Sequence, residues 1–426
     1  RVLFRSPFAL ATSCFTSVAF ADDVVGNGFS TIVEERERDF SAVTDFVNSK
    51  RALSIAEKGG ALMISGDIHA EWSSLRCRNK HVRERGSGSG NLVPPTLPHP
   101  PFATNEFDIE VNLILDYKAD RSWATIQFQL DNPMGIRNVP FVEGQNSNKN
   151  ILWGSGITNN ISMRKAFMGY NLYEEGTSRL DFEIGRRRLY DVFDSKVQFF
   201  SIFDGALLKY AQSFEGITDF TAKAAAFIVD QTVNHYGYVG ELGFLNLGDS
   251  GIDFKYSLIT WRRNGANRYG LKHAKGSKFV NSQLTLAYNI SPDLIKYKSK
   301  VYGAFVHNHD AHGNRFTHHK KKDNAFYVGY RMGEVKKKND WAVDLRYEWV
   351  QAQAIPERDC SGILRDNPRN ISFYNSTSHG FANYRGYKID TFYALTDNWT
   401  LNAFFERAIE QSHKIGGKHR SWMFEL

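Results

Sequence analysis

A cluster of charged residues beside one predicted loop has the clearest potential for chemistry in this sequence. Three arginines end a predicted strand, and two aspartates and a lysine follow in the aromatic segment YDVFDSKVQFFSIF: Arg186, Arg187, Arg188, Asp191, Asp194 and Lys196. Basic side chains that oppose acidic ones at a narrow point of a pore create a transverse electric field. The expected chemistry is therefore electrostatic steering of ions. The connection 189–203 is too apolar for a free surface loop, so it either folds into a lumen or packs on a rim.

The usual residue patterns for covalent or metal chemistry are weak. No GxSxG motif occurs and no His-Ser pair has a convincing placement, so we predict that the chain is not an enzyme. The segment 308–322 contains four histidines, but it has one carboxylate and nothing that fixes a ligand geometry. We therefore predict no metal site and no cofactor, and we interpret the histidines as a solvated loop.

Two of the three cysteines are candidates for a disulfide. Cys77 and Cys360 both fall in predicted long outer connections, and an oxidising compartment would allow them to pair. Cys14 lies in the predicted leader described below. No Cys/His spacing indicates zinc.

The elements that position the charges are strands with one apolar and one polar face. In FDIEVNLILDY, residues 107–117, the odd-numbered residues are apolar, and Asp108, Glu110 and Asp116 point the other way. Successive side chains of a strand alternate between its faces. In residues 338–351 the same parity turns Asp344, Arg346 and Glu348 away from an apolar face.

The number of strands and the lengths of the connections predict an all-β chain, a transmembrane antiparallel β-barrel. We expect about 16 strands, within a range of 14–18, separated by alternately short and long connections. Short connections on one side and long ones on the other are typical of outer-membrane barrels. The strands are expected near 61–73, 105–118, 121–131, 162–173, 178–188, 204–214, 218–230, 235–247, 250–262, 279–290, 299–310, 323–334, 338–351, 384–396, 399–410 and 418–426.

The two faces of such a barrel meet different surroundings. The apolar face meets outer-membrane lipid, and the polar face lines a lumen that is too wide for side chains to fill. The lumen residues are mixed in sign, so small hydrophilic solutes or ions are the expected partners, and the sequence does not give the selectivity. The net charge of +7 comes mainly from outer loops. We therefore predict no nucleic-acid partner, and a surface adhesin that binds a polyanion through these loops stays an alternative, as does a barrel enzyme.

The N-terminal region differs from the rest. Residues 1–21 have a basic start, an apolar stretch and an Ala19-Phe20-Ala21 cleavage site, which predicts a signal peptide. Apolar residues between 31 and 58 are spaced as in a helix, so residues 22–60 are expected to form a periplasmic helical segment, with a plug of the lumen as the alternative. Residues 61–426 are expected to form the barrel. An even strand number would place both termini in the periplasm, and the pattern of the last strand stops before a full crossing.

Two segments resemble a known family. SGDIHAEW at 65–72 and GRRRLYDVFDSKVQFFSIFDGALLKY at 185–210 resemble the outer-membrane porins of chlamydia-like bacteria. The architecture is also similar to general sixteen-stranded porins, in which the loop after the fifth strand, here 189–203, enters the pore. The resemblance implies passive diffusion of small hydrophilic solutes through a homotrimer in the outer membrane of a Gram-negative type of cell. The short last strand departs from the family.

Overall fold

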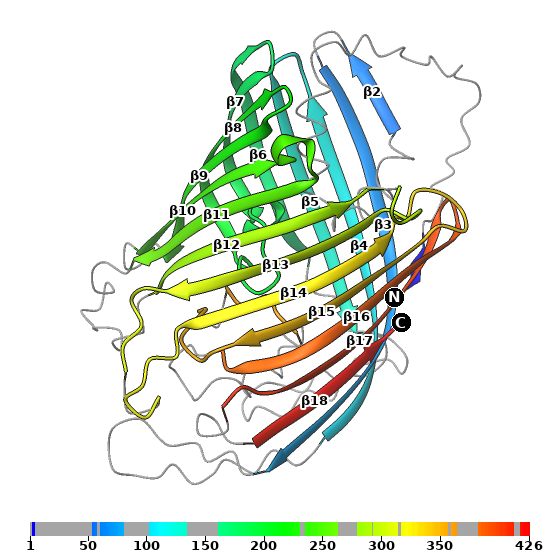
Figure 1. Ribbon diagram of the computed structural model, residues 1–426. Coiled ribbons are helices and arrows are strands. Elements are labelled where there is room, and N and C mark those ends of the chain that lie inside the picture. Colours follow the sequence, from blue (N-terminus) through cyan, green and yellow to red (C-terminus); the bar gives the residue numbers. More distant parts are fainter. Residues whose placement is uncertain are drawn as a thin grey trace, which may run out of the picture.

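The computed structural model shows a closed β-barrel (Figure 1). It describes residues 2–4, 53–57, 60–80, 102–133, 161–230, 235–262, 279–291, 293–313, 317–356, 359–363, 382–412 and 418–426. Within this part of the chain, no helix is both long enough and apolar enough to span a bilayer.

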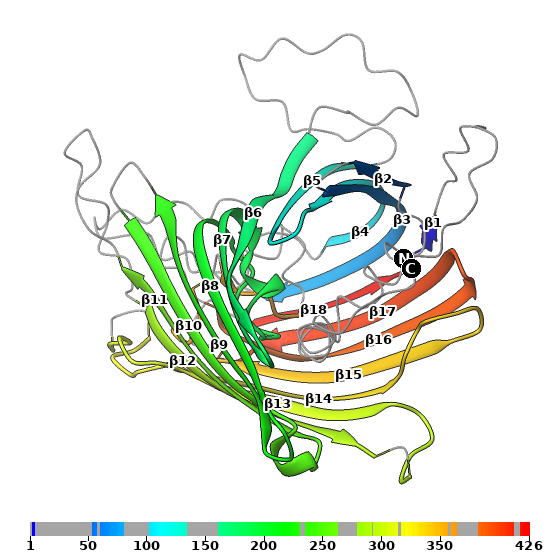
Figure 2. The same ribbon diagram turned by 90° about the horizontal axis from the view of Figure 1, so that it is seen from above.

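Sixteen strands, β3 to β18, make the barrel, and each runs antiparallel to the next along the chain. The last, β18, also pairs with β3 and closes the ring that Figure 2 views from above. The strands are β3 Gly60–Lys80, β4 Phe102–Lys118, β5 Ser122–Pro133, β6 Ile161–Glu175, β7 Ser178–Arg188, β8 Ile202–Phe214, β9 Thr218–Asp230, β10 His235–Leu245, β11 Ile252–Arg262, β12 Phe279–Ile290, β13 Ser299–Asn308, β14 Asn324–Gly333, β15 Trp341–Val350, β16 Tyr384–Thr396, β17 Trp399–Glu410 and β18 Lys418–Glu425. The prediction of sixteen strands is confirmed.

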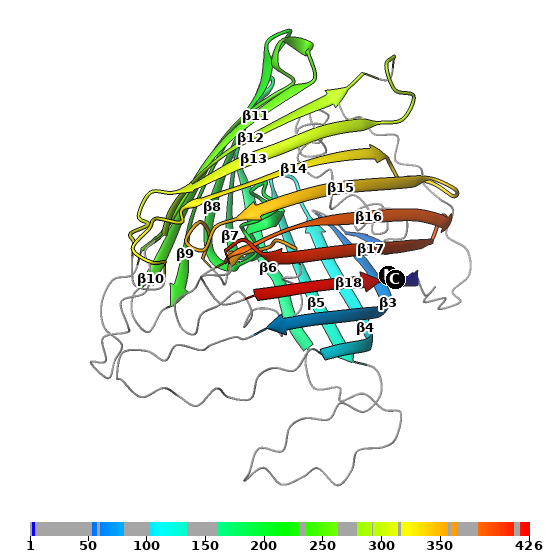
Figure 3. The ribbon, with the colours of Figure 1, turned by 60° about the horizontal axis from the view of Figure 1, so that its bottom comes forward.

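The seam of the barrel is built from both ends of the chain. Along one edge of β3, residues 73–80 pair with β18, and Trp72 and Leu426 exchange backbone hydrogen bonds of 2.9 Å. The same edge then pairs with two short strands, β1 (Val2–Phe4) and β2 (Leu53–Glu57). Since β1 pairs with β17 as well, it continues the line of β18. The N- and C-terminal ends therefore lie side by side (Figure 3).

The predicted helical segment at 22–60 is not supported. Its described part, Leu53–Glu57, is a strand that forms a tight hairpin with the first residues of β3. The segment LSIAE alternates apolar and polar or small residues as a strand does, and the edge of β3 offers unsatisfied backbone groups to it. The remaining residues of the predicted helix lie outside the described part of the chain.

The alternation of faces is present as expected. On β4, Phe107 is 54 % and Leu113 is 44 % exposed on the outside, whereas Asn112 is buried on the inside. β15 follows the same rule, with Leu345 exposed and Asp344 and Glu348 buried. An outer surface with this much exposed apolar area requires an apolar surrounding, and the polar face lies within the closed ring.

Apolar residues are also buried inside the barrel, which the polar-interior rule does not predict. Two clusters lie there, one around Phe203, Phe227 and Ile259, and the other around Tyr302, Val306 and Tyr384. Both clusters include residues from connections between strands. Segments of the chain therefore enter the barrel and cover part of its wall.

Candidate functional site

The first of these segments, residues 189–201, connects β7 to β8 and is called the first inner segment. It begins with a 3-10 turn, Leu189–Asp191. Leu189, Phe193 and Phe199 are at most 1 % exposed. They pack in one cluster with the wall residues Phe203, Leu207, Phe227, Val239 and Ile259. Of the two positions left open by the sequence, the structure favours the interior.

Wall side chains hold the backbone of the first inner segment. Lys223 Nζ donates a hydrogen bond of 2.9 Å to the Val192 carbonyl, and Gln283 Nε2 donates one of 2.6 Å to the Asp194 carbonyl. Gln198 Nε2 donates to Gln283 Oε1 at 3.1 Å. The two donors to backbone carbonyls come from β9 and β12, so polar side chains of the inner wall satisfy backbone groups of the inserted chain.

A second inserted segment lies against the first. It consists of residues 351–356 and 359–363 and is called the second inner segment. The carboxylate of Asp359 accepts hydrogen bonds from the backbone N–H of Phe199 and of Ser201, both 3.1 Å. The backbone carbonyl of Asp359 accepts a third, 3.1 Å, from Phe200. Burial raises the pKa of Asp359 to about 6, against these hydrogen bonds, which lower it.

Further contacts bind the second inner segment to its neighbours. Ser361 donates two hydrogen bonds of 3.1 Å to the first inner segment, from its N–H to Val197 and from its hydroxyl to Gln198. The Ile363 N–H donates to Glu348 Oε2 on β15 at 3.0 Å. Both inner segments are thus joined to each other and to the wall.

Asp194 and Lys196 of the first inner segment face the wall of β11 to β15. Lys255 Nζ lies 3.4 Å from Asp194 Oδ2, and Lys196 Nζ lies 5.9 Å from the centre of the Tyr302 ring. Burial alone would raise the pKa of Asp194, but Lys255, Lys196 and Lys300 lower it to about 2. Burial lowers the pKa of Lys196 to about 8, and Asp194 opposes this effect. Asp194 is therefore ionised at neutral pH, and Lys196 titrates near the physiological range.

The structure brings the charges of β15 close to this segment. Arg346 Nε lies 2.6 Å from Glu348 Oε1, and the Tyr302 hydroxyl donates to Asp344 Oδ1 at 2.6 Å. Lys196 interacts electrostatically with Arg346 and Asp344. Five of the residues predicted to line the interior therefore form one mixed group: Asp194, Lys196, Asp344, Arg346 and Glu348.

The three arginines of β7 are placed differently from one another. Arg187 pairs on the inside with Glu183, which also lies 2.9 Å from Lys209 Nζ. Arg186 forms a two-point ion pair with Asp204, and both side chains are about half exposed on the other face. Arg188 lies with its guanidinium 5.2 Å from the Tyr190 ring centre, and Asp191 pairs with Lys165 at 3.1 Å.

The predicted carboxylates of β4 lie on another part of the inner wall. Glu110 accepts a hydrogen bond of 2.8 Å from Asn112, and Asp116 accepts one of 2.6 Å from Thr125. Asp108 accepts one of 2.9 Å from the Ile109 N–H. None of the contacts described for these three carboxylates reaches the inner segments.

The disulfide predicted between Cys77 and Cys360 stays a prediction, because the side chain of Cys77 lies outside the described part of the chain. Cys360 is buried in the second inner segment, with its Sγ 3.9 Å from the Tyr384 hydroxyl. Cys77 belongs to β3, where it pairs with Ser421 and Phe102 across the neighbouring strands. Insertion of its segment into the barrel, which the sequence did not reveal, places Cys360 beside β16. Among the described residues, no group of His, Cys, Asp and Glu side chains could hold a metal ion.

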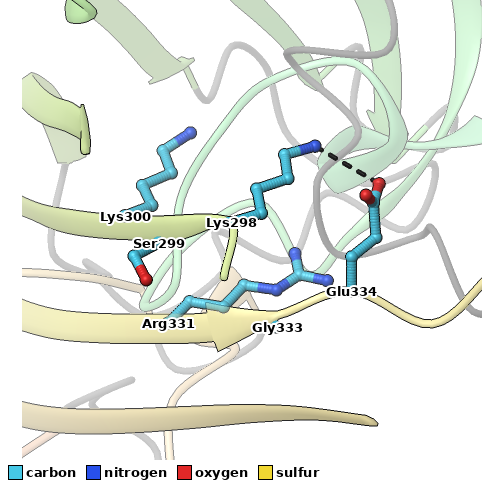
Figure 4. A pocket seen from close by; sticks show the side chains of 6 residues that line it. All are labelled: Lys298, Ser299, Lys300, Arg331, Gly333 and Glu334. Carbon is cyan, nitrogen blue, oxygen red and sulfur yellow. Dashed lines mark hydrogen bonds and ion pairs between the residues drawn. The ribbon is translucent and has the colours of Figure 1, made fainter. Parts of the chain in front are cut away.

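A small hollow lies at the short-turn end of β13 and β14 (Figure 4). Lys298, Lys300, Arg331 and Glu334 line it, and Lys298 Nζ lies 3.3 Å from Glu334 Oε1. Lys300 and Arg331 are direct cross-strand neighbours. This basic end adds to the mixed charge of the interior.

Three residues that hold the inner segments in place have no signal in the sequence pattern: Asp359, Gln198 and Gln283. One signal could have indicated an inserted segment. Around GALL in β8 and AAAFIV in β9, residues of both parities are apolar or small, so the inner wall there needs an apolar cover.

Comparison with known proteins gives similar folds and no family. No family model matches the chain, and no curated protein matches its sequence. Salmonella typhi OmpF in complex with daunomycin is 10 % identical, with 88 % of this chain and 99 % of that chain covered, at a TM-score of 0.45. The low-pH structure of Pseudomonas putida OprB is 9 % identical, with 84 % and 91 % covered, at 0.40. A mutant of the Rh. blastica porin is 9 % identical, with 85 % and 99 % covered, at 0.36.

These likenesses assign no role to any residue of this chain and do not separate a channel from an enzyme. The resemblance to porins of chlamydia-like bacteria is not shown by them and stays a hypothesis.

Proposed function

We propose that this protein is a porin, a passive diffusion channel for small hydrophilic solutes or ions in the outer membrane of a Gram-negative type of cell. One observation carries the proposal. A closed ring of sixteen strands has apolar side chains outside and charged side chains inside, and two connections are folded into it. A barrel of this strand number has an interior that side chains from the wall do not fill.

In this proposal the inner segments form the constriction. Lys196 and Asp194 from the first inner segment and Arg346 from β15 set the local field for passing ions. Acidic groups on β4, including Glu110 and Asp116, line another part of the inner wall. Opposed charges at a narrow point select solutes by electrostatics, and no bond of the solute changes. The protein would therefore act without a cofactor.

The proposed leader and the seam of the barrel make a linked prediction. Residues 1–21 contain β1, so cleavage after Ala21 would remove β1 from between β17 and β3. N-terminal sequencing of the membrane-inserted protein would show which form is present. We also propose periplasmic termini and a homotrimer, which crosslinking in outer-membrane fractions would test.

Planar-bilayer recording tests the channel. Purified, refolded protein should give discrete conductance steps, and reversal potentials in a salt gradient should give the ion preference. Liposome swelling with sugars of increasing size should give the solute cut-off. An absence of steps from correctly folded barrels would overturn the proposal.

A further inference from the structure

The second inner segment is the feature of the interior that the channel proposal leaves without a role. Its apolar residues Ala354, Ile355 and Ile363 are at most 1 % exposed. They pack in a cluster with Tyr302, Val306 and Tyr384 of the wall and with Val197 of the first inner segment. The segment therefore lies inside the barrel between the wall and the first inner segment, and it is not a surface loop.

The contact between the two inner segments is made largely of backbone groups. Asp359 receives the N–H groups of Phe199 and Ser201 on its two carboxylate oxygens and that of Phe200 on its carbonyl, and Ser361 adds two hydrogen bonds. One carboxylate thus binds two N–H groups that are two residues apart in the sequence. Phe199, between them, has a positive φ of 73°, a conformation that disfavours a bulky residue. A local partner that binds both flanking N–H groups stabilises this backbone.

We propose that Asp359 is a positioning residue of the constriction: it fastens the first inner segment inside the lumen, so that the two inner segments set the aperture as one body. This inference rests on the proposed channel function. Asp359 touches no solute in this scheme and acts through the backbone of residues 199–201. Hydrogen bonds to a buried carboxylate are stronger than neutral ones, because the acceptor carries charge.

Three variants test the proposal. Asp359→Ala removes both side-chain acceptors, and Asp359→Asn keeps the volume and one of the two. Asp340→Ala is the matched control. Asp340 also accepts two backbone N–H groups, from Lys336 and Lys337, but at the short β14–β15 turn outside the lumen. All variants should form the barrel, as judged by their migration in gels before and after heating.

Single-channel recording is the first measurement. The wild type and Asp340→Ala should hold one steady open level, and Asp359→Ala should fluctuate among several levels. Asp359→Asn should lie between them. Identical traces from Asp359→Ala and a conducting wild type would overturn the inference and leave the channel proposal intact.

Amide hydrogen exchange is the second measurement, and it does not depend on conduction. Exchange of Phe199 and Ser201 should speed up about tenfold or more in Asp359→Ala, because charged hydrogen bonds contribute more than a neutral bond. The same amides in Asp340→Ala should exchange as in the wild type. Unchanged exchange in Asp359→Ala would refute the role of Asp359, even if the wild type did not conduct. A silent wild type with faster exchange in the variant would instead overturn only the channel proposal.

Discussion

The inner wall has two halves, which differ in the polarity of their buried inward side chains. Between β3 and β7, the open half, no apolar side chain among those described is buried, and the buried inward residues are polar, such as Asp67, Asn112 and Glu183. Between β8 and β17, the covered half, large apolar residues such as Phe203 and Tyr384 face inward. The apolar residues of the inner segments pack on the covered half. The insertion is therefore encoded in the wall as much as in the loops.

The difference teaches how a polar lumen and a packed interior coexist. In the open half, neighbouring side chains satisfy one another, as when Asn112 donates to Asp67 and Gln127 donates to Asn112. In the covered half, exposed phenyl rings facing water would be unfavourable, and burying them under a loop contributes roughly 1.5–3 kcal/mol for each fully buried ring. The open half thus presents polar side chains to the lumen, whereas the covered half packs against other segments of the chain.

The largest predicted effect comes from removing the two phenyl rings that pack the first inner segment against the wall. Replacing both Phe193 and Phe199 by Ala should cost about 3–5 kcal/mol at each site, because both rings are fully buried. The segment should leave the wall, and single-channel conductance should rise while the barrel still forms.

The matched control for this prediction is Phe107→Ala on the open half, where the ring points outward and is 54 % exposed. It should leave conductance unchanged. A double variant with wild-type conductance would show that the apolar wall of the covered half does not hold the segment.

The second prediction concerns pH and the stability of the covered half. Burial raises the pKa of Asp359 to about 6 in the folded protein from the ordinary value of 3.8. A carboxyl group with a raised folded pKa binds protons more tightly in the folded state. Its contribution therefore favours the folded state at low pH and is lost as pH rises from about 4 to 6. The loss is at most about 3 kcal/mol, at 1.36 kcal/mol for each pKa unit.

Urea unfolding at pH 4 and pH 7 measures this loss. Wild type should lose more stability over that range than Asp359→Asn, whose side chain does not titrate. If Asp359 were hydrated in the folded state, the free energies of unfolding of the two proteins would change in parallel with pH. That result would contradict the burial of Asp359 between the inner segments.

The third prediction uses charge on the open half. Glu183 lies on the inside between Arg187 and Lys209, so Glu183→Gln leaves two cations facing the lumen. One unit charge about 10 Å from an ion in water changes its energy by ~0.4 kcal/mol, which is about twofold in permeability. The reversal potential should shift in the direction that indicates a greater permeability to anions. Asp204→Asn removes the same charge from the outer face of β8 and should shift it little.

The strands were predictable from sequence because each has one face toward the apolar surroundings and one toward the interior. Apolar and polar residues therefore alternate along it. Ser178–Arg188 and Tyr384–Thr396 begin and end where the pattern places them. The site was only partly predictable. Asp194, Lys196 and Arg346 were identified by charge and parity, and they do come together.

The hydrogen bonds that join the two inner segments could not be predicted from charge and parity. Phe199 and Asp359 are 160 residues apart, and a backbone N–H bound to a carboxylate has no signature in residue types. The helix expected before the barrel is not supported in its described part, for a related reason. Leu53–Glu57 is a strand because the edge of β3 is available to it, and local spacing does not report a distant edge.

The smallest predicted effect tests how the covered half meets the solution. Burial lowers the pKa of Lys196 to about 8, although Asp194 acts in the opposite direction. Below pH 8 Lys196 adds a positive charge to the constriction, and above pH 8 that charge is lost. Cation preference should therefore increase between pH 7 and 9, by no more than about twofold for one charge. Reversal potentials across this range measure it.

A variant without a titratable side chain at position 196 tests whether Lys196 causes the pH dependence. Lys196→Met keeps an unbranched side chain without the charge, so its reversal potential should be flat between pH 7 and 9 and equal to the wild-type value at high pH. If the wild type shifts only above pH 10, Lys196 is hydrated as a free lysine would be. The first inner segment would then face open water at its tip. If Lys196→Met keeps the full shift, another group titrates, and the charge of Lys196 does not act on the permeating ion.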